Sequence, residues 1–318
     1  MNGKNILILQ GGLNEEHKVS LTTAKEVNKA LKTLGYNTDF LNVNPKNFKK
    51  TISLLNPDCC FNALHGSFGE DGQVQNILFN LNIPFTHSGT SSSIKAFNKN
   101  VTKTNLQNTK INCLESELIS SPKLSIQILK EQLERFKLLV IKPLSSGSSY
   151  GVRILDSIKS IEKFINFELK QKMIYKNHQN LIIEPYIKGK ELTVTVLERA
   201  ESSEPIAVTE IISKNNFFDY TAKYTKGYSK HLLPANLSNS VYKQCLEHAK
   251  VAHDTLGCRG VSRSDFIYSK ELNKLFFLEI NTQPGLTPIS LVPEQLKYKG
   301  ITFIELIDLL IKLAKCQN

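Results

Sequence analysis

The chain has 318 residues, of which 41% are hydrophobic and 22% are charged, a composition typical of globular rather than disordered proteins. At about 150 residues per domain, this length predicts roughly two domains, or three small ones. No apolar run approaches the roughly 18–20 residues of a membrane span, and the run at 6–9 is too short for a signal peptide. We therefore expect a soluble, cytoplasmic protein that binds no membrane and keeps its six cysteines reduced.

The formal net charge is +11, because 40 basic residues outweigh 29 acidic ones. Such a charge can indicate nucleic-acid binding. Only five of the 40 basic residues are arginine, however, and the lysines are scattered along the chain. Arginine is the preferred reader of bases and phosphates. We therefore expect no nucleic-acid partner, whereas an anionic small-molecule substrate suits this composition.

Strand-like and helix-like segments alternate at the start of the chain. The pattern predicts strands at 5–9, 39–43 and 58–64, and helices at 19–34 and 73–81. Gly35 stands where a helix C-terminus favours glycine. This alternation predicts an α/β domain with a largely parallel sheet. Residues 84–93 are expected to form the exit of the chain from this domain.

Two further regions follow, at about 94–186 and 187–318, and they give the chain α+β character in part. They contain predicted strands at 137–142, 152–155, 181–186 and 191–197, a hairpin of 261–268 with 274–281, and helices at 157–169, 240–256 and 301–313. Residues 214–234 are long and polar, which predicts a lid or a functional loop.

A lysine followed by small residues makes a candidate phosphate loop. Lys142 stands at a strand end and precedes the Gly/Ser-rich segment 145–151, whose backbone N–H groups could surround phosphate oxygens. An ordinary hairpin is the alternative. Residues 147–151 also match the G-x-S-x-G elbow of hydrolases, but that motif requires a helix directly after it. A strand is predicted there, which disfavours a hydrolase.

Cysteine and histidine residues near the predicted helix 240–256 have spacings that suggest zinc. They are Cys245, His248, His253 and Cys258. His253 lies about 140° around the helix from His248, so the side chains would not converge on one ion. A structural helix is the better interpretation.

Three oxygen-bearing side chains on the predicted hairpin form a stronger group. Glu279 and Asn281 are two residues apart on one strand and share a face, and Asp265 on the paired strand could face the same side. Two carboxylates and an amide suit Mg²⁺ that also contacts phosphate. The alternative is an ordinary solvated strand face. The tight Pro-Gly turn directly after Asn281 favours the metal site.

A Gly-rich segment at 65–72 follows the third predicted strand, at the sheet edge where open α/β sheets bind ligands. Glu16 and His17 follow the first strand and would lie at the same edge. A plain turn is the alternative for 65–72.

Together these segments resemble the D-alanine–D-alanine ligase family of the ATP-grasp superfamily. The matching segments, in order along nearly the whole chain, are 11–21, 65–72, 141–151, 191–194, 220–224, 257–260, 263–265, 279–287 and 290–293. The resemblance implies a three-domain ATP-grasp architecture. Its domains would be an N-terminal open parallel α/β substrate domain at 1–93, a central ATP-grasp domain at 94–186 and a C-terminal ATP-grasp domain at 187–318, with the lid at 214–234.

The activity implied by the resemblance is the ATP-dependent ligation of two D-alanines to D-alanyl-D-alanine, through an acylphosphate, for peptidoglycan and cell shape. ATP would be a substrate, two Mg²⁺ or Mn²⁺ ions would assist, and the protein would be a homodimer. The nearest alternative is another ATP-grasp carboxylate–amine ligase or a D-alanine–D-lactate ligase. An alternative from another class is a non-catalytic nucleotide-binding protein.

The resemblance also implies roles for individual residues. Those expected to bind ATP are Lys99, Lys142, Ser148, Glu184, Ile187, Glu191 and Lys223, and those expected to bind metal are Asp265, Glu279 and Asn281. Those expected to be catalytic are Glu16, Ser148, Tyr224, Arg263, Gly285 and Ser290. Glu16 would hold the first substrate's ammonium, with His65 nearby.

Around the second substrate, the resemblance implies Lys223, Tyr224 and Ser290. Arg263 and the N–H of Gly285 would face the reacting carbonyl.

Four positions depart from the usual family pattern. Pro185 replaces a common Lys in the adenine linker, Asn98 a common Asp, Asn14 a common Ser and Ser264 an aliphatic residue. None of these positions is a candidate metal ligand.

Overall fold

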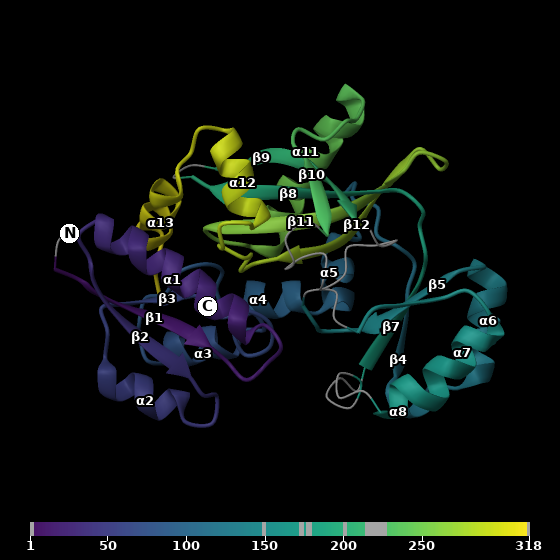
Figure 1. Cartoon of the computed structure of the whole chain (residues 1–318), viewed down its shortest axis with the longest axis horizontal. Coiled ribbons are helices and arrows are strands. Elements are labelled where there is room, and N and C mark those ends of the chain that lie inside the picture. Colours follow the sequence, from purple (N-terminus) through teal and green to yellow (C-terminus); the bar gives the residue numbers. More distant parts are fainter. Residues whose placement is uncertain are drawn as a thin grey trace.

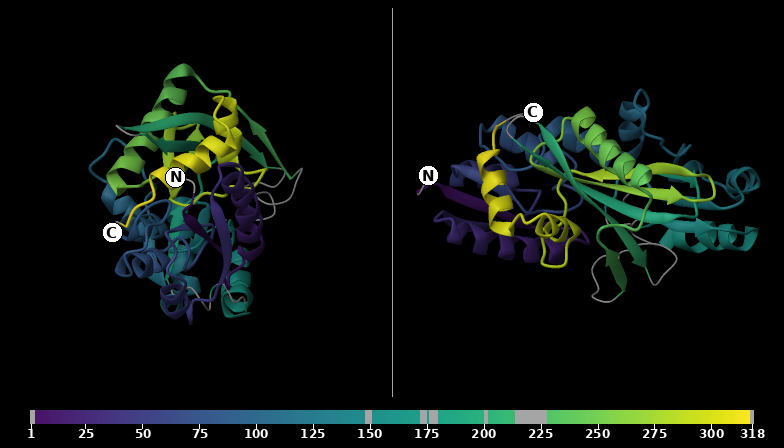
Figure 2. Two further views of the ribbon diagram at one scale, coloured as in Figure 1. Left: turned by 90° about the vertical axis from the view of Figure 1, so that its left-hand side faces the viewer. Right: turned by 90° about the horizontal axis from the view of Figure 1, so that it is seen from above.

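The computed structural model describes residues 3–147, 151–171, 175, 180–199, 202–213 and 228–316. Three separate sheets run along an elongated molecule, with the N-terminal sheet at one end and the four-stranded sheet at the other (Figures 1 and 2). None of the described helices is both long and apolar enough to cross a membrane.

The first sheet is parallel, as expected, with strand order β2-β1-β3. Its strands are β1 (Asn5–Gly11), β2 (Asn37–Val43) and β3 (Cys59–Asn62), and its helices are α1 (His17–Thr33), α2 (Phe48–Leu55) and α3 (Gln73–Asn80). Ile6 and Ile8 pack in the core that includes α1, whereas Leu7 and Leu9 pack in the core that includes α2 and α3. Because both faces of β1 are covered, its sequence is a continuous apolar run.

The second sheet is antiparallel, with order β4-β7-β5-β6. Its strands are β4 (Glu117–Ser120), β5 (Leu139–Pro143), β6 (Arg153–Leu155) and β7 (Asn180–Pro185). The helical segments of this region are η1 (Ser121–Lys123), α6 (Ile126–Phe136), α7 (Ile158–Lys163), the π-helical η2 (Phe164–Glu168) and α8 (Leu169–Gln171). Leu129, Ile161 and Phe164 from these helices share one core with the strands. Because the strand β6 follows residues 147–151, that segment is not a hydrolase elbow.

The third sheet is antiparallel, with order β10-β9-β8-β11-β12. Its strands are β8 (Lys190–Glu198), β9 (Ser203–Ser213), β10 (Ser229–Leu232), β11 (Val261–Ser269) and β12 (Lys274–Asn281). The helix α11 (Asn239–Leu256) packs against it through an apolar core, and α12 (Leu291–Tyr298) contacts β8 and β9. The predicted hairpin is confirmed as β11–β12.

The prediction of one long loop at 214–234 is wrong for Ser229–Leu232, because these residues form β10 and pair with β9. A polar sequence is compatible with this strand because it lies at the edge of the sheet. Residues 214–227 of the expected lid lie outside the described part of the chain.

Some elements that are distant in sequence pack against each other. The last helix, α13 (Phe303–Lys312), packs beside α1, so Leu306 and Leu310 share a core with Val27 (Figure 1). The helices α4 (Thr90–Phe97) and α5 (Lys99–Leu106) contact α11 of the third sheet's layer. The domain limits at 93 and 186 stay predictions.

Candidate active site

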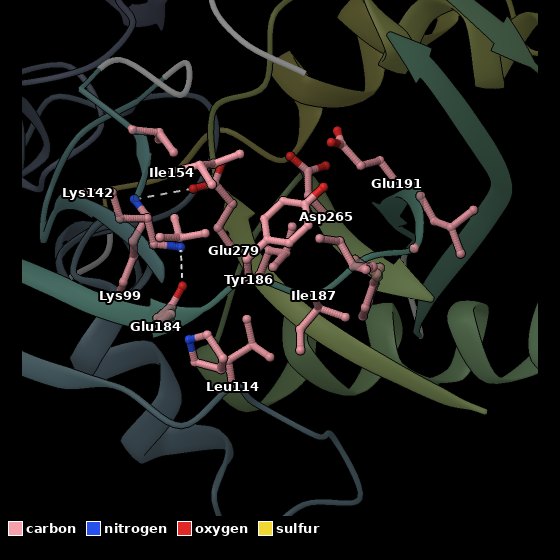
Figure 3. A pocket seen from close by; sticks show the side chains of 18 of the residues that line it. Lys99, Leu114, Lys142, Ile154, Glu184, Tyr186, Ile187, Glu191, Asp265 and Glu279 are labelled. Atoms are coloured by element: carbon pink, nitrogen blue, oxygen red, sulfur yellow. Dashed lines mark ion pairs between the residues drawn. The ribbon is translucent and has the colours of Figure 1, made fainter. Parts of the chain in front are cut away.

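A large pocket lies between the second and third sheets (Figure 3). On β5, Leu139 and Ile141 are in the helix-covered core, whereas the alternate residues Val140 and Lys142 line the pocket. Because alternate residues of a strand point to opposite faces, β5 places Lys142 at the cavity while its other face packs in the apolar core. The expected ATP and metal residues that line it are Lys99, Lys142, Glu184, Ile187, Glu191, Asp265 and Glu279.

Glu184 forms ion pairs with two lysines and is only 2% exposed. Lys142 Nζ lies 2.7 Å from its Oε2, and Lys103 forms an ion pair with its Oε1. Burial raises the pKa of Glu184, but the two ammonium groups outweigh that effect and hold this pKa below its usual range. Glu184 therefore remains a carboxylate.

Lys99 stands at the first position of α5, where the Asn98 side chain caps the helix by accepting hydrogen bonds from two backbone N–H groups. Asn98 therefore performs the capping that the commoner Asp would perform. Lys99 Nζ donates to Ser146 O at 3.0 Å and lies 3.3 Å from Glu279 Oε2. Burial lowers the pKa of Lys99, and the Glu279 carboxylate partly offsets that effect.

The candidate metal ligands lie on facing strands, and a β-bulge brings them to one face. Asp265 pairs directly with Glu279. The next pair is Phe266 with Phe277, so Leu278 is an extra residue on β12. Strict alternation would have placed Glu279 on the same face as the buried Phe277. The bulge instead turns Glu279 into the pocket.

The donor set fits a hard divalent cation. Two carboxylates directly opposite each other on paired strands repel unless a cation lies near them. Arg263 contacts both oxygens of Asp265 at 2.9 Å, and Asn281 Oδ1 accepts from the N–H of Gln283 at 2.7 Å. Oxygen-only ligands of this kind match Mg²⁺ or Mn²⁺.

A second, small pocket adjoins the large one and shares Lys99, Ser146 and Glu279 with it. The expected site residues that line it are Glu16, His65, Lys99, Arg263, Glu279, Asn281 and Gly285. The two pockets therefore meet at the ammonium of Lys99 and the carboxylate of Glu279.

Glu16 is 4% exposed and stands directly before α1. Asn14 holds its backbone, because Asn14 Oδ1 accepts from the Glu16 N–H while Asn14 Nδ2 donates to His65 O at 2.7 Å. A Cβ on Gly66 or on Gly147 would lie only 2.7 Å from Glu16 Oε2, so both positions require glycine. The loop at 145–147 thus closes directly over the Glu16 carboxylate.

His65 is held on both sides of its ring. Nε2 lies 3.0 Å from Thr23 Oγ1, and Nδ1 lies 3.3 Å from Glu70 Oε1. Burial lowers the pKa of His65, but Glu70 and Glu16 outweigh it, so the pKa is raised overall.

Ser290 lies beside Gly285, because a Cβ built on Gly285 would be 2.9 Å from Ser290 Oγ. Ser290 Oγ accepts from the Thr287 N–H at 3.0 Å, which closes the turn before α12. Ser148, Lys223 and Tyr224 lie outside the described residues.

Sequence reasoning missed two contributors to the site. Lys103 lies one helical turn after Lys99 on α5, and this i,i+4 spacing was a usable signal. Gln283 is buried and joins the hairpin exit to the first sheet: it accepts from Asn62 Nδ2 at 2.7 Å and donates to Leu64 O. No sequence pattern indicated that contact, which spans 221 residues.

A family model described as D-ala D-ala ligase C-terminus matches residues 105–312. A D-alanine–D-alanine ligase of Rickettsia typhi is 38% identical over 316 residues, covering 99% of this chain and 93% of that protein. One from Wolbachia pipientis is 40% identical over 308 residues, with 96% and 93% covered. The Bacillus anthracis D-alanine–D-alanine ligase complexed with ATP is a structural neighbour with a TM-score of 0.79 at 25% identity, covering 98% of this chain and 97% of that one. The chain therefore belongs to the D-alanine–D-alanine ligase family.

Proposed function

We propose that the protein joins two D-alanines to D-alanyl-D-alanine with cleavage of ATP to ADP and phosphate. The observation that carries this proposal is that the large and small pockets meet at Lys99 and Glu279. A nucleotide in the large pocket would direct its terminal phosphate toward a carboxylate held in the small one. Family membership and the ATP complex of the Bacillus anthracis enzyme support ATP as the nucleotide.

In the first step, the carboxylate of one D-alanine attacks the γ-phosphate of ATP, giving an acylphosphate and ADP. Glu184 and Ile187 would border the adenine and Glu191 the ribose, as in the family pattern. Lys142 and Lys99 would neutralise phosphate charge, which is most of what phosphoryl transfer requires. Mg²⁺ or Mn²⁺, two ions held by Asp265, Glu279 and Asn281, would add charge neutralisation and orient the phosphates when bound.

In the second step, the amine of the other D-alanine attacks the acylphosphate carbonyl and displaces phosphate. Glu16 would hold the ammonium of the first D-alanine, beside His65. Arg263 and the Gly285 N–H would stabilise the oxyanion of the tetrahedral intermediate. Ser290 would contact the second substrate, with Lys223 and Tyr224. The buried side chains Glu16, His65 and Lys99 in the wall of the small pocket would help to limit hydrolysis of the acylphosphate by water.

The same proposal extends to the setting of the reaction. The dipeptide would feed peptidoglycan synthesis in the cytoplasm, and the enzyme would work as a homodimer. Size-exclusion chromatography with light scattering would test the oligomeric state.

The decisive experiment incubates the protein with ATP, Mg²⁺ and D-alanine, and measures phosphate release together with the product mass. We expect D-alanyl-D-alanine in proportion to phosphate, and none with L-alanine alone. Phosphate release without dipeptide would contradict the proposal. A parallel reaction with D-lactate tests the alternative, since that ligase would form a depsipeptide.

A further inference from the structure

Two ammonium groups share one buried carboxylate at the wall of the large pocket. Lys103 is paired with Glu184 Oε1 and Lys142 with Glu184 Oε2. Lys103 Nζ also donates to Leu114 O at 2.9 Å. Lys142 and Glu184 line the pocket, whereas Lys103 lies behind Glu184 and does not line it. The group therefore has an inner lysine that faces the cavity and an outer one that does not.

The net charge of these three side chains determines how strongly Lys142 can attract a phosphate. Lys142 and Glu184 alone would sum to zero, and a buried ion pair presents little field to a ligand. With Lys103 the three side chains sum to +1. Such a charge acts strongly here because the lysine side chains are about 10% exposed and the Glu184 side chain only 3%.

We propose that Lys103 is a positioning residue that neutralises Glu184 and so keeps the positive charge of Lys142 available to the nucleotide phosphates. This inference rests on the proposed function, because it assumes that ATP occupies the large pocket. It goes further by assigning the phosphate affinity of Lys142 to a residue that touches neither the cavity nor the nucleotide.

A purely structural role makes a different prediction. Lys103 ties α5 to Leu114 and β7, and Leu114 lines the pocket. If Lys103 only shaped the cavity, its loss would weaken the binding of every ligand that contains the base. If Lys103 acts through charge, its loss would selectively weaken the binding of ligands that carry phosphate. Adenosine and ATP therefore distinguish the two roles.

The experiment measures binding of ATP, ADP and adenosine by calorimetry to four proteins: wild type, Lys103→Met, the double variant Lys103→Met/Glu184→Gln, and Lys110→Met. Lys110 is exposed and serves as the matched control for the loss of one charge. For Lys103→Met we expect ATP affinity to fall at least about 10-fold, with little change for adenosine. The double variant restores the net charge of +1. Because Glu184 would border the adenine, recovery is measured as the ratio of ATP affinity to adenosine affinity, which should return close to that of wild type although the Leu114 contact is still missing. Lys110→Met should resemble wild type.

Equal losses for ATP and adenosine in Lys103→Met, or a double variant whose ratio of ATP affinity to adenosine affinity is no higher than that of the single one, would overturn the inference. If Lys103→Met does not fold, the double variant is compared with Glu184→Gln, from which it differs only at Lys103. Because the Glu184→Gln background has no carboxylate to neutralise, the inference expects about equal ATP binding by the two variants. A selective loss of ATP affinity in the double variant would show that Lys103 acts on the phosphates without Glu184, and would overturn the inference. Failure of wild type to bind ATP would instead count against the proposed function.

Discussion

The large pocket is lined mostly by strand residues of two sheets, whereas the small pocket joins loops and helix ends from distant parts of the chain to β11 and β12. In the large pocket, ladder hydrogen bonds position the side chains, and ion pairs settle their charge. In the small pocket, single contacts between distant residues, such as Asn14 with His65 O and Asn62 with Gln283, position them. Loss of one side-chain contact in the nucleotide site should therefore leave the shape of that site unchanged. Loss of one charge there should still weaken its function. The substrate site should lose its geometry when one bridge is removed.

The largest effect should come from the shared boundary of the two pockets. Glu279→Gln removes one charge and nearly preserves shape, so the fold should remain while turnover falls at least about 10²-fold. Steady-state kinetics across a Mg²⁺ titration measure this, with circular dichroism as the check on folding. Near-normal turnover with unchanged Mg²⁺ dependence would show that Glu279 is not a metal ligand.

The next test acts on the small pocket alone. Glu16→Gln replaces the carboxylate beside Gly66 and Gly147 with a neutral amide of similar size. Loss of a charge-assisted hydrogen bond to an ammonium should raise the KM for the first D-alanine roughly 10- to 150-fold. The KM for ATP is the internal control and should stay close to wild type. A parallel rise in both values would mean that the two pockets are not separable in this way.

A third test concerns the second substrate and Tyr224. The family resemblance implies that Tyr at this position goes with dipeptide synthesis, and Phe with D-lactate as nucleophile. We propose that the Tyr224 hydroxyl hydrogen-bonds to polar groups beside the second substrate. Tyr224→Phe removes that hydroxyl, so the depsipeptide-to-dipeptide ratio should rise roughly 5- to 150-fold when D-lactate and D-alanine compete. Mass spectrometry of the products measures the ratio. The specificity role fails if wild type already prefers D-lactate near neutral pH, or if the ratio does not move.

A smaller effect should follow from removing the bridge between the hairpin exit and the first sheet. Gln283→Met leaves Asn62 Nδ2 and Leu64 O without this partner, so the free energy of unfolding should fall by about 1–3 kcal/mol. Gln107→Met is the exposed control and should change it little. In Asn62→Leu/Gln283→Met, the second substitution should cost less than it does alone, because the partner is already gone. Strict additivity in urea denaturation would argue against a coupled bridge.

The smallest effect concerns pH and a histidine outside both pockets. His253 is buried, with Nδ1 2.8 Å from Ser262 Oγ, and burial lowers its pKa to about 4. The unfolded chain therefore binds a proton that the folded chain does not, between about pH 6.5 and 4. His253 should thus lower the free energy of unfolding by about 1 kcal/mol as pH falls from about 6.5 to 5.5. His253→Gln should lose less stability than wild type over this interval in urea titrations, and an identical loss would contradict the assignment.

Much of the framework was predictable because it depends on local periodicity. The apolar run that begins at Asn5 predicted β1, and Gly35 predicted the end of α1: its φ is +81°, and the N–H of Tyr36 bonds to Leu31 O. The hairpin was also predictable, but the pairing of Asp265 with Glu279 was not, because it depends on the register shift between Asp265 and Phe266. Polar elements such as β10 were not, because an edge strand needs no apolar alternation.

The sequence by itself determined which chemical groups the site contains, because phosphate and metal chemistry require lysines, carboxylates and glycines in characteristic motifs. The tertiary structure alone decided how those groups are oriented. The extra residue Leu278 turns Glu279 away from the core and into the pocket, and no periodicity announces a bulge. Likewise, Lys103 reaches Glu184 across 81 residues, and Asn62 reaches Gln283 across 221. Contacts of this kind depend on how helices and sheets pack, which the spacing of residues within one element does not encode.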